Sequence, residues 1–287
     1  MDNATESIVK LDSLIRQSHN PMIICHTGAD PDALSSLAAM KFILFTHYQK
    51  KEVLAVGERI PAALSFIPGY NEVTNGSIFE TLQKNSVDLL IFLDFGQLHL
   101  ASKLDAGEIK KYIQKAGIPV AIIDHHPAEH KDIEADVYIN IDPTSTATNL
   151  HLVFHKELGF PIIPKVADSL MYGIIADTNR FKFAYGQHSQ APLLSISAEL
   201  LAHSTVSIEH IANSMERIEL ATLKVISVFM KNTELHTKEF AYTLLSNEDL
   251  AAYDLDSKKL GDAALYISNL VISLVETATS GVVIYPH

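Results

Sequence analysis

Short apolar runs alternate with stretches of helical periodicity between residue 21 and about residue 180. Strands are expected near 21–25, 52–56, 87–93 and 118–123, and helices near 33–48, 76–84 and 105–116. Short strands that alternate with longer helices are typical of βαβ units, in which parallel strands are covered by helices on both faces. The pattern therefore predicts an α/β fold with a parallel, doubly wound sheet.

The rest of the chain is predicted to be helical and then mixed. Two further helices are expected near 145–158 and 165–176, and residues 190–233 have an almost wholly helical pattern. After residue 234 the pattern becomes strand, turn, helix and strand. Because 287 residues are about twice the usual ~150-residue domain, we expect more than one domain. The division expected is a main domain over 1–190, a helical connector over 191–233 and a smaller α/β domain over 234–287.

The composition argues against several classes of protein. A formal net charge of −12 is unfavourable for binding along a long nucleic-acid backbone, which needs clustered Lys and Arg. The apolar runs at 87–93 and 118–123 fall short of the roughly 20 residues that span a bilayer, and the N-terminus lacks the pattern of a signal peptide. The single cysteine, Cys25, agrees with a reducing compartment. We therefore expect a cytoplasmic protein without a membrane partner.

Acids and histidines follow the ends of the predicted strands. In open parallel sheets, ligands bind beyond the carboxyl ends of the strands. The first strand runs into the segment HTGADPD, which contains His26, Asp30 and Asp32. An aspartate before a proline is also a good helix N-cap. Capping explains Asp30, but it explains neither His26 nor Asp32.

The third strand, the fourth strand and a later helix end in similar side chains. Asp94 closes the third strand, and the triplet Asp124, His125 and His126 closes the fourth. If the backbone stays extended, the two histidines point in roughly opposite directions, so that one can bind a metal while the other faces a substrate. Asp124 is the candidate acceptor that orients an imidazole. Asp177 ends an apolar helix, where the helix dipole prefers a cation and a nearby metal ion would remove the conflict.

These positions give a candidate ligand set of oxygen and nitrogen atoms without thiolate: His26, Asp30, Asp32, Asp94, His125 and Asp177. Such a set favours Mn²⁺, with Mg²⁺, Co²⁺ or Zn²⁺ as alternatives. Six ligands exceed one site and suit two ions about 3.5–4 Å apart, bridged by one carboxylate. A pair of ions can activate a water and clamp both oxygens of a phosphoryl centre. The residues therefore indicate metal-dependent hydrolysis of phosphoesters or phosphoanhydrides.

Four segments in order, HTGADPDALSS, FLDFGQ, IIDHHPAEH and GIIADTNRF, resemble the four motifs of the DHH phosphoesterase family over roughly residues 20–185. The resemblance implies one metal held by His26, Asp30 and Asp94, and another held by Asp32, Asp94, His125 and Asp177. Asp94 would be the bridging ligand. The resemblance also implies that His126 faces the scissile phosphate as a stabiliser or proton donor, and it leaves Asp124 as the acceptor behind the metal-binding imidazole; His126 and Asp124 are the catalytic candidates.

The length and the helical connector look most like the oligoribonucleases and phosphoadenosine phosphate phosphatases that carry a C-terminal DHHA1 domain. Members of that group usually have a Gly-rich segment with a histidine near the C-terminus. This chain ends in SGVVIYPH and contains no Gly-Gly pair, so 234–287 is expected to be an incomplete DHHA1-like domain. Pro31 and Ser35 stand where the family often has glycine, which stiffens the first loop. Arg180 and Lys182 are the candidates for binding the phosphate of the substrate.

The function expected is hydrolysis of short oligonucleotides, adenosine 3′,5′-bisphosphate or dinucleotides, so the partner is a small phosphorylated molecule rather than a long nucleic acid. One alternative is a manganese-dependent inorganic pyrophosphatase. That enzyme would need several basic side chains in the C-terminal domain, and after residue 234 only Lys238, Lys258 and Lys259 are basic. The other alternative is a catalytically silent metal-binding homologue. The sequence leaves open the exact substrate, the resident metal and the assembly, for which a homodimer is the candidate.

Overall fold

The computed structural model describes residues 3–127, 132–182, 190–216, 220–237 and 240–243. The chain divides into two compact units, Met1–Met215 and Glu216–His287, and each is described by itself. The predicted division into 1–190, 191–233 and 234–287 stays a prediction, because most of its last part lies outside the described residues.

A six-stranded sheet forms the centre of the first unit. Its strands are β1 Pro21–Cys25, β2 Leu54–Gly57, β3 Thr74–Asn75, β4 Leu89–Leu93, β5 Val120–Ile123 and β6 Val137–Ile139. They lie in the order β3-β2-β1-β4-β5-β6, and every neighbouring pair is parallel. The chain therefore builds outward on one side of β1 and then, from β4, on the other side. Ligands of open α/β sheets bind beyond the carboxyl ends of the strands at such a reversal of strand order.

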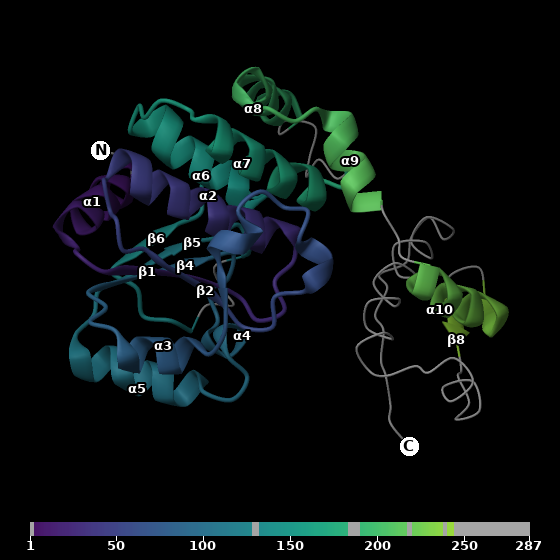
Figure 1. Ribbon diagram of the computed structural model, residues 1–287, viewed down its shortest axis with the longest axis horizontal. Helices are drawn as coiled ribbons and strands as arrows, with labels where there is room; N and C mark the ends of the chain where they lie inside the picture. The colour runs from purple at the N-terminus through teal and green to yellow at the C-terminus, as the bar shows by residue number, and fades with distance from the viewer. Residues whose placement is uncertain (1–2, 128–131, 183–189, 217–219, 238–239, 244–287) are drawn as a thin grey trace. The chain divides into compact units, whose positions relative to one another are not determined.

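Helices cover both faces of the sheet (Figure 1). One face carries α1 Asn3–Gln17, α2 Pro31–His47, α6 Thr146–His151 and α7 Pro164–Asp177, and the other carries α3 Ile78–Lys84 and α5 Ala106–Ala116. Strand β4 is buried along its whole length because both of its faces are covered. Leu89, Ile91 and Leu93 belong to one core, whereas Leu90 and Phe92 belong to the other. Such burial on both faces accounts for the continuous apolar run, and the predicted doubly wound α/β fold is confirmed.

The predicted strands and helices of this sheet are confirmed, with ends that differ by at most two residues. The stretch expected to be helical near 145–158 contains α6 and then a π-helical turn, η4 Leu152–Glu157. Helix α1 and strands β3 and β6 were not predicted from the sequence. The two strands are two and three residues long, too short to show a period of their own. The remaining short elements are η1 Ala62–Leu64, η2 Tyr70–Glu72 and α4 Leu98–Ala101.

Helices make up most of the described part of the chain beyond α7, up to Lys231. They are α8 Gln190–His203, α9 Ile208–Glu216 and α10 Leu220–Lys231, and the last of these is followed by an antiparallel pair, β7 Thr233–Thr237 and β8 Phe240–Thr243. Within the described part of the chain, no single helix is both long and apolar enough to cross a membrane. The bent pair Gln190–His203 and Ile208–Met215 meets the two criteria jointly, by length and composition only.

Candidate metal centre

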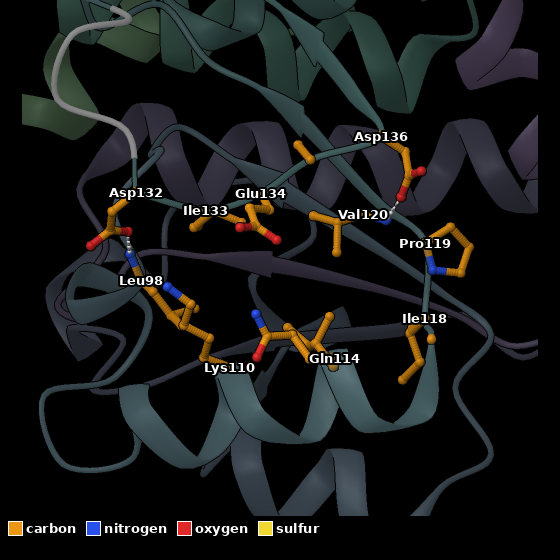
Figure 2. Close-up of a pocket in the computed structure, with 13 residues that line it drawn as sticks. Leu98, Lys110, Gln114, Ile118, Pro119, Val120, Asp132, Ile133, Glu134 and Asp136 are labelled. Carbon is orange, nitrogen blue, oxygen red and sulfur yellow. Dashed lines mark hydrogen bonds between the residues drawn. The ribbon is translucent and has the colours of Figure 1, made fainter.

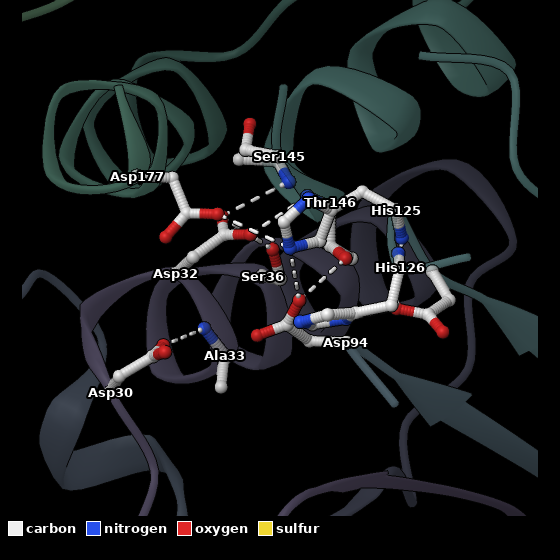
Figure 3. A network of polar contacts seen from close by, with 12 residues as sticks. Asp30, Asp32, Ala33, Ser36, Asp94, His125, His126, Ser145, Thr146 and Asp177 are labelled. Carbon is white, nitrogen blue, oxygen red and sulfur yellow. Dashed lines mark hydrogen bonds and ion pairs between the residues drawn. The ribbon is translucent and has the colours of Figure 1, made fainter. Parts of the chain in front are cut away.

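The predicted acids and histidines gather where the strand order of the sheet reverses. His26 follows β1, Asp94 follows β4 and Asp124 follows β5, and these three strands are neighbours. The first turn of α2 adds Asp32, and the last residue of α7 adds Asp177. Figure 3 shows the carboxylates of α2 and α7 facing the side chains that follow β4 and β5. The location agrees with the general position of ligand sites in open α/β sheets.

Asp30 has two contacts at the start of α2. One carboxylate oxygen accepts a hydrogen bond from the Ala33 amide at 2.9 Å and caps the helix, while the other oxygen lies 3.8 Å from His26 Nε2. The same nitrogen lies 3.6 Å from an oxygen of Asp94. Because the two oxygens of Asp30 face different partners, capping the helix and binding a metal do not exclude each other.

Asp32 is fully buried beneath the N-terminus of α6. Its Oδ2 accepts a hydrogen bond from the Thr146 amide at 2.7 Å, and its Oδ1 accepts one from the Ala147 amide at 3.1 Å. A buried carboxylate needs such partners because its desolvation is costly. The two amides therefore fix the position of Asp32 within the cluster.

Asp94 lies between His26 and His125, the two histidines of the predicted ligand set. Its backbone has φ 71, a left-handed conformation in which Asp is more common than most residues with a side chain. The buried carboxylate faces a different imidazole with each oxygen: Oδ1 lies 3.3 Å from His125 Nε2, and Oδ2 lies 3.6 Å from His26 Nε2. Thr146 Oγ1 also donates to Oδ1 at 2.9 Å. This is the arrangement that a bridging ligand requires.

The expectation that His125 and His126 point in opposite directions is wrong. Their ring centres lie 4.2 Å apart, with 51° between the ring planes. The backbone turns after β5 because Asp124 Oδ1 accepts hydrogen bonds from the amides of both histidines, at 2.8 and 3.2 Å. The same oxygen is 2.8 Å from His126 Nδ1. Asp124 is thus an orienting acceptor, as predicted, but it orients His126 rather than His125, whose Nδ1 lies 3.2 Å from the Pro143 carbonyl.

Asp177, from the fourth motif, is the last residue of α7 and lies in the cluster. Asp177 Oδ2 lies 3.2 Å from His125 Nε2. Arg180 follows in a turn at φ 59, and its Nη1 donates to Asn179 Oδ1 at 3.2 Å. Lys182 is exposed at the end of the described segment. Asp177 therefore lies among the predicted ligands, whereas the contribution of Arg180 and Lys182 to substrate binding stays a prediction.

Burial and mutual repulsion disturb the ionisation of the cluster. Burial alone would lower the pKa values of His26 and His125, but hydrogen bonds to Asp94 and the neighbouring carboxylate charges raise them to about 9 and about 10. Burial and nearby acids raise the pKa of Asp177 to about 7 and that of Asp32 well above its usual range. Burial also opposes ionisation of Asp94, but hydrogen bonds from the two histidines hold its pKa below the usual range. Positive charge at this point would relieve the repulsion among the acids.

The donor atoms fit divalent metal ions. Three groups of ligand atoms each lie within 4.8 Å of one another: His26, Asp30 and Asp94; Asp32, His125 and Asp177; and Asp94, His125 and His126. The two N···O distances of His125, 3.3 Å to Asp94 and 3.2 Å to Asp177, are close to the spacing of about 3 Å between neighbouring ligands on an ion with bonds of about 2.1 Å. The first group contains the three ligands that the sequence motifs imply for one metal position, and the second contains three of the four implied for the other, without Asp94. The third brings His126 near the ligands as well.

The segment 143–149 belongs to the site but was not predicted from the sequence. Ser145 caps α6 by accepting a hydrogen bond from the Thr148 amide at 3.0 Å. The cap presents the next two amides to Asp32 and the Thr146 hydroxyl to Asp94. The run PTSTATN at the start of the helix predicted near 145–158 was the available signal, because Ser and Thr are favoured N-caps. That run predicts the start of a helix but not the carboxylates that its amides meet.

A separate cavity lies between α5 and residues 132–136 (Figure 2). Its volume is about 400 Å³, and it is lined by none of the predicted site residues. Two of its acids already serve the backbone: Asp132 accepts from the Leu98 amide at 2.7 Å, and Asp136 accepts from the Val120 amide at 3.0 Å. These contacts make the two carboxylates structural.

The sequence profile described as "DHH family, N-terminal domain" matches residues 20–174, more than half of the chain. The chain belongs to the DHH family. It is therefore a phosphoesterase, a hydrolase with acidic and histidine groups that can bind metal, and the triplet after β5 is the one that gives the family its name.

Relatives of this DHH protein differ in what they act on. The bifunctional oligoribonuclease and PAP phosphatase NrnA of Bacillus subtilis is 27% identical over 252 residues, which are 87% of this chain and 71% of that protein. A probable manganese-dependent inorganic pyrophosphatase of Streptococcus pyogenes is 22% identical over 204 residues, which are 71% of this chain and 59% of that protein. The crystal structure of an exopolyphosphatase-related protein from Bacteroides fragilis has a TM-score of 0.77 at 18% identity and covers 95% of this chain and 78% of that one. The last similarity supports the fold.

Proposed function

We propose that this DHH protein hydrolyses short oligonucleotides, adenosine 3′,5′-bisphosphate or dinucleotides with the help of two divalent metal ions. The observation that carries the proposal is the position of Asp94, whose two oxygens face His26 on one side and His125 on the other. The similarity to an oligoribonuclease and PAP phosphatase over 87% of the chain supports the choice of substrate. Oxygen and nitrogen ligands without thiolate favour Mn²⁺ as the metal.

The proposed ligands are His26, Asp30 and Asp94 for one ion, and Asp32, His125 and Asp177 for the other. Asp94 is proposed to join the second set as well, because its Oδ1 lies 3.3 Å from His125 Nε2. Two bound ions would polarise the phosphoryl group and make a water nucleophilic near neutral pH. The chain supplies the rigid frame, because Asp32 and Asp94 are each held by hydrogen bonds from α6. A ligand held in one position needs little rearrangement when the metal or the substrate binds.

We propose His126 as the proton donor to the leaving oxygen. Its side chain is 54% exposed, and its Nδ1 lies 2.8 Å from Asp124 Oδ1. The hydrogen bond to Asp124 raises the pKa of His126, which favours the protonated ring. An imidazolium held by one nitrogen can present the other, Nε2, to a substrate and donate its proton there.

Arg180 is the proposed contact for a substrate phosphate, because it follows Asp177 closely and its guanidinium can bind phosphate oxygens in pairs. A small substrate agrees with the net charge of −12, which disfavours long nucleic acids. The cytoplasmic location, the homodimer and the DHHA1-like character of 234–287 stay predictions. The last of these lies almost wholly outside the described residues.

Inorganic pyrophosphate is the second candidate substrate. The similarity to a probable manganese-dependent pyrophosphatase over 71% of the chain favours it. The scarcity of basic residues after 234, where only Lys238, Lys258 and Lys259 occur, disfavours it, because a small, highly charged anion needs several cations around it. We therefore place this substrate second.

A substrate panel tests both proposals. The full chain is loaded with Mn²⁺ and given a pApA-type dinucleotide, adenosine 3′,5′-bisphosphate, a cyclic dinucleotide and pyrophosphate, with EDTA-treated protein as the control. We expect turnover of a nucleotide substrate that EDTA abolishes and Mn²⁺ restores. Turnover of pyrophosphate alone would establish the second candidate, and the absence of turnover on every substrate would point to a catalytically silent homologue.

A further inference from the structure

His126 is held from two sides, and only one of them belongs to its own motif. Asp124 Oδ1 accepts a hydrogen bond from the His126 amide at 3.2 Å and lies 2.8 Å from the ring Nδ1. The chain then enters Pro127, which has no amide hydrogen to donate. Asp124 therefore fixes the amide and the ring of His126 and leaves its carbonyl oxygen for another partner.

The end of strand β6 supplies that partner. Asn140 directly follows β6, and its Nδ2 donates a hydrogen bond to the His126 carbonyl at 2.7 Å. The Tyr138 hydroxyl donates to the same oxygen at 3.4 Å, and Asn140 Nδ2 lies 3.4 Å from that hydroxyl. Side chains two residues apart on a strand point to the same face, so Tyr138 and Asn140 are both directed at His126.

The pairing of β5 with β6 gives the two sets of contacts a common base. Ile123 of β5 pairs with Ile139 of β6, and the Asp124 amide donates to the Ile139 carbonyl at 3.0 Å. Asp124 and Asn140 are therefore the next residues on two neighbouring, hydrogen-bonded strands. His126 lies between them, with its amide and ring on Asp124 and its carbonyl on Asn140. Contacts from two strands restrict the peptide of His126 more than those of Asp124 alone.

We propose that Asn140 is a positioning residue for His126: by holding the His126 carbonyl, it keeps the imidazole turned so that Nε2 reaches the leaving oxygen of the substrate. The inference rests on the proposed role of His126 as proton donor. In that step water attacks phosphorus, the bond to the leaving oxygen breaks, and the Nε2 proton moves to that oxygen. Asn140 is exposed, and its contacts with His126 and Tyr138 involve no proposed metal ligand. Its replacement should therefore disturb proton transfer and leave metal binding intact.

A merely structural role for Asn140 predicts a different result. Hydrogen bonds from exposed side chains to backbone carbonyls also stabilise ordinary helix ends and loops. Asn85 makes such a contact at the end of α3, where its Nδ2 donates to the Thr81 carbonyl at 2.8 Å. Asn85 precedes β4, at the opposite edge of the sheet from the metal centre. Asn85→Ala is therefore the matched control, because it removes the same donor group from the same kind of acceptor.

The test is a double-mutant cycle on the full chain loaded with Mn²⁺. Turnover of the nucleotide substrate that wild type prefers is measured for wild type, Asn140→Ala, His126→Gln and the double variant. General acid catalysis contributes about 10²–10⁴-fold, so partial misplacement of His126 in Asn140→Ala should lower kcat by about 10-fold. In the His126→Gln background there is no proton donor left to position, so the double variant should be no slower than His126→Gln. Asn85→Ala should keep wild-type kcat and lose as much stability in urea unfolding as Asn140→Ala.

The leaving group gives a second readout that a structural role would not move. Hydrolysis of bis(p-nitrophenyl) phosphate releases p-nitrophenolate, a stable anion that needs no proton donor. A nucleotide ester releases an alkoxide, which does need one. Asn140→Ala and His126→Gln should both lose turnover of the nucleotide and keep near-wild-type turnover of the p-nitrophenyl ester.

Four results would overturn the inference: wild-type turnover in Asn140→Ala, an equal loss in both backgrounds, an equal loss on both substrates, or weaker Mn²⁺ binding in that variant. Failure of the proposed function looks different. If wild type turns over no nucleotide, or if His126→Gln is as fast as wild type, the role of His126 is wrong and the inference fails with it. If His126→Gln is slow and Asn140→Ala is not, the inference alone is wrong.

Discussion

Gly173 is the residue whose replacement tests the geometry of the metal centre most sharply. It lies in α7 against the first turn of α2. A Cβ added there would lie 2.4 Å from Asp32 Oδ1, 2.6 Å from Ser35 Oγ and 2.8 Å from Ala147 Cβ. Asp32 cannot yield freely, because both of its oxygens accept amide hydrogen bonds from α6. In Gly173→Ala, either α7 moves away from α2 or the carboxylate of Asp32 is displaced.

The expected change in the free energy of unfolding of Gly173→Ala follows from two opposing effects. Alanine in place of glycine inside a helix is favourable by about 0.5–1 kcal/mol, whereas overpacking a tight interior costs about 1–3 kcal/mol. We expect the free energy of unfolding of the metal-free protein to fall by about 0–2.5 kcal/mol, the difference between those two ranges. Restoring an ordinary contact with Asp32 needs a shift of about 1 Å, and a misplacement of that size can reduce activity by about 100-fold. A 100-fold loss corresponds to about 2.7 kcal/mol of transition-state stabilisation, so the catalytic effect should equal or exceed the loss of stability.

The assay compares Gly173→Ala with Gly107→Ala. Gly107 also lies in a helix, α5, but a Cβ there would meet no atom within 4 Å. Urea unfolding, titration with Mn²⁺ and turnover of the best substrate are measured for both variants. Gly107→Ala should keep wild-type metal affinity and activity and gain up to about 1 kcal/mol of stability. Wild-type metal affinity and turnover in Gly173→Ala would refute the argument that the position of Asp32 is critical.

Four further changes probe single contacts. Asp94→Asn keeps a side chain that tolerates positive φ but removes the bridging charge, so turnover should vanish and Mn²⁺ titration should show weakened binding. Thr146→Val removes the hydrogen bond to Asp94 and should cost about 0.5–1.5 kcal/mol in urea unfolding, with weaker Mn²⁺ binding. His126→Gln should preserve metal content while turnover falls by about 10²–10⁴; loss of metal would instead make His126 a ligand. In the metal-free protein the pKa of His151 is about 4 when folded against an ordinary 6.5, so the unfolded state binds more protons between these values. Stability should therefore fall by up to about 3 kcal/mol as the pH drops through that window, and His151→Phe should flatten the dependence seen in unfolding curves.

Much of the metal centre could be located from the sequence because its residues stand where apolar runs stop. His26, Asp94 and Asp124 each come directly after a strand that the hydrophobic pattern marks. The carboxyl ends of parallel strands meet at one edge of a sheet, so the gathering of these side chains follows from the strand prediction alone. The orientation of His126 could not be predicted from the sequence. It depends on the Asp124 carboxylate, which accepts hydrogen bonds from the amides of His125 and His126 and from the His126 ring.

The sequence by itself determined the fold class, the family and the chemical type of the donors. These properties are local: periodicity, residue identity and short motifs are present in any window of the chain. Only the tertiary structure decided which groups hold the donors in place. Thr146 meets Asp32 across 114 positions and Asp94 across 52, and His151 of α6 meets Glu199 of α8. Such contacts arise when helices pack on a sheet, and no periodicity within one segment specifies which side chains of distant segments will meet.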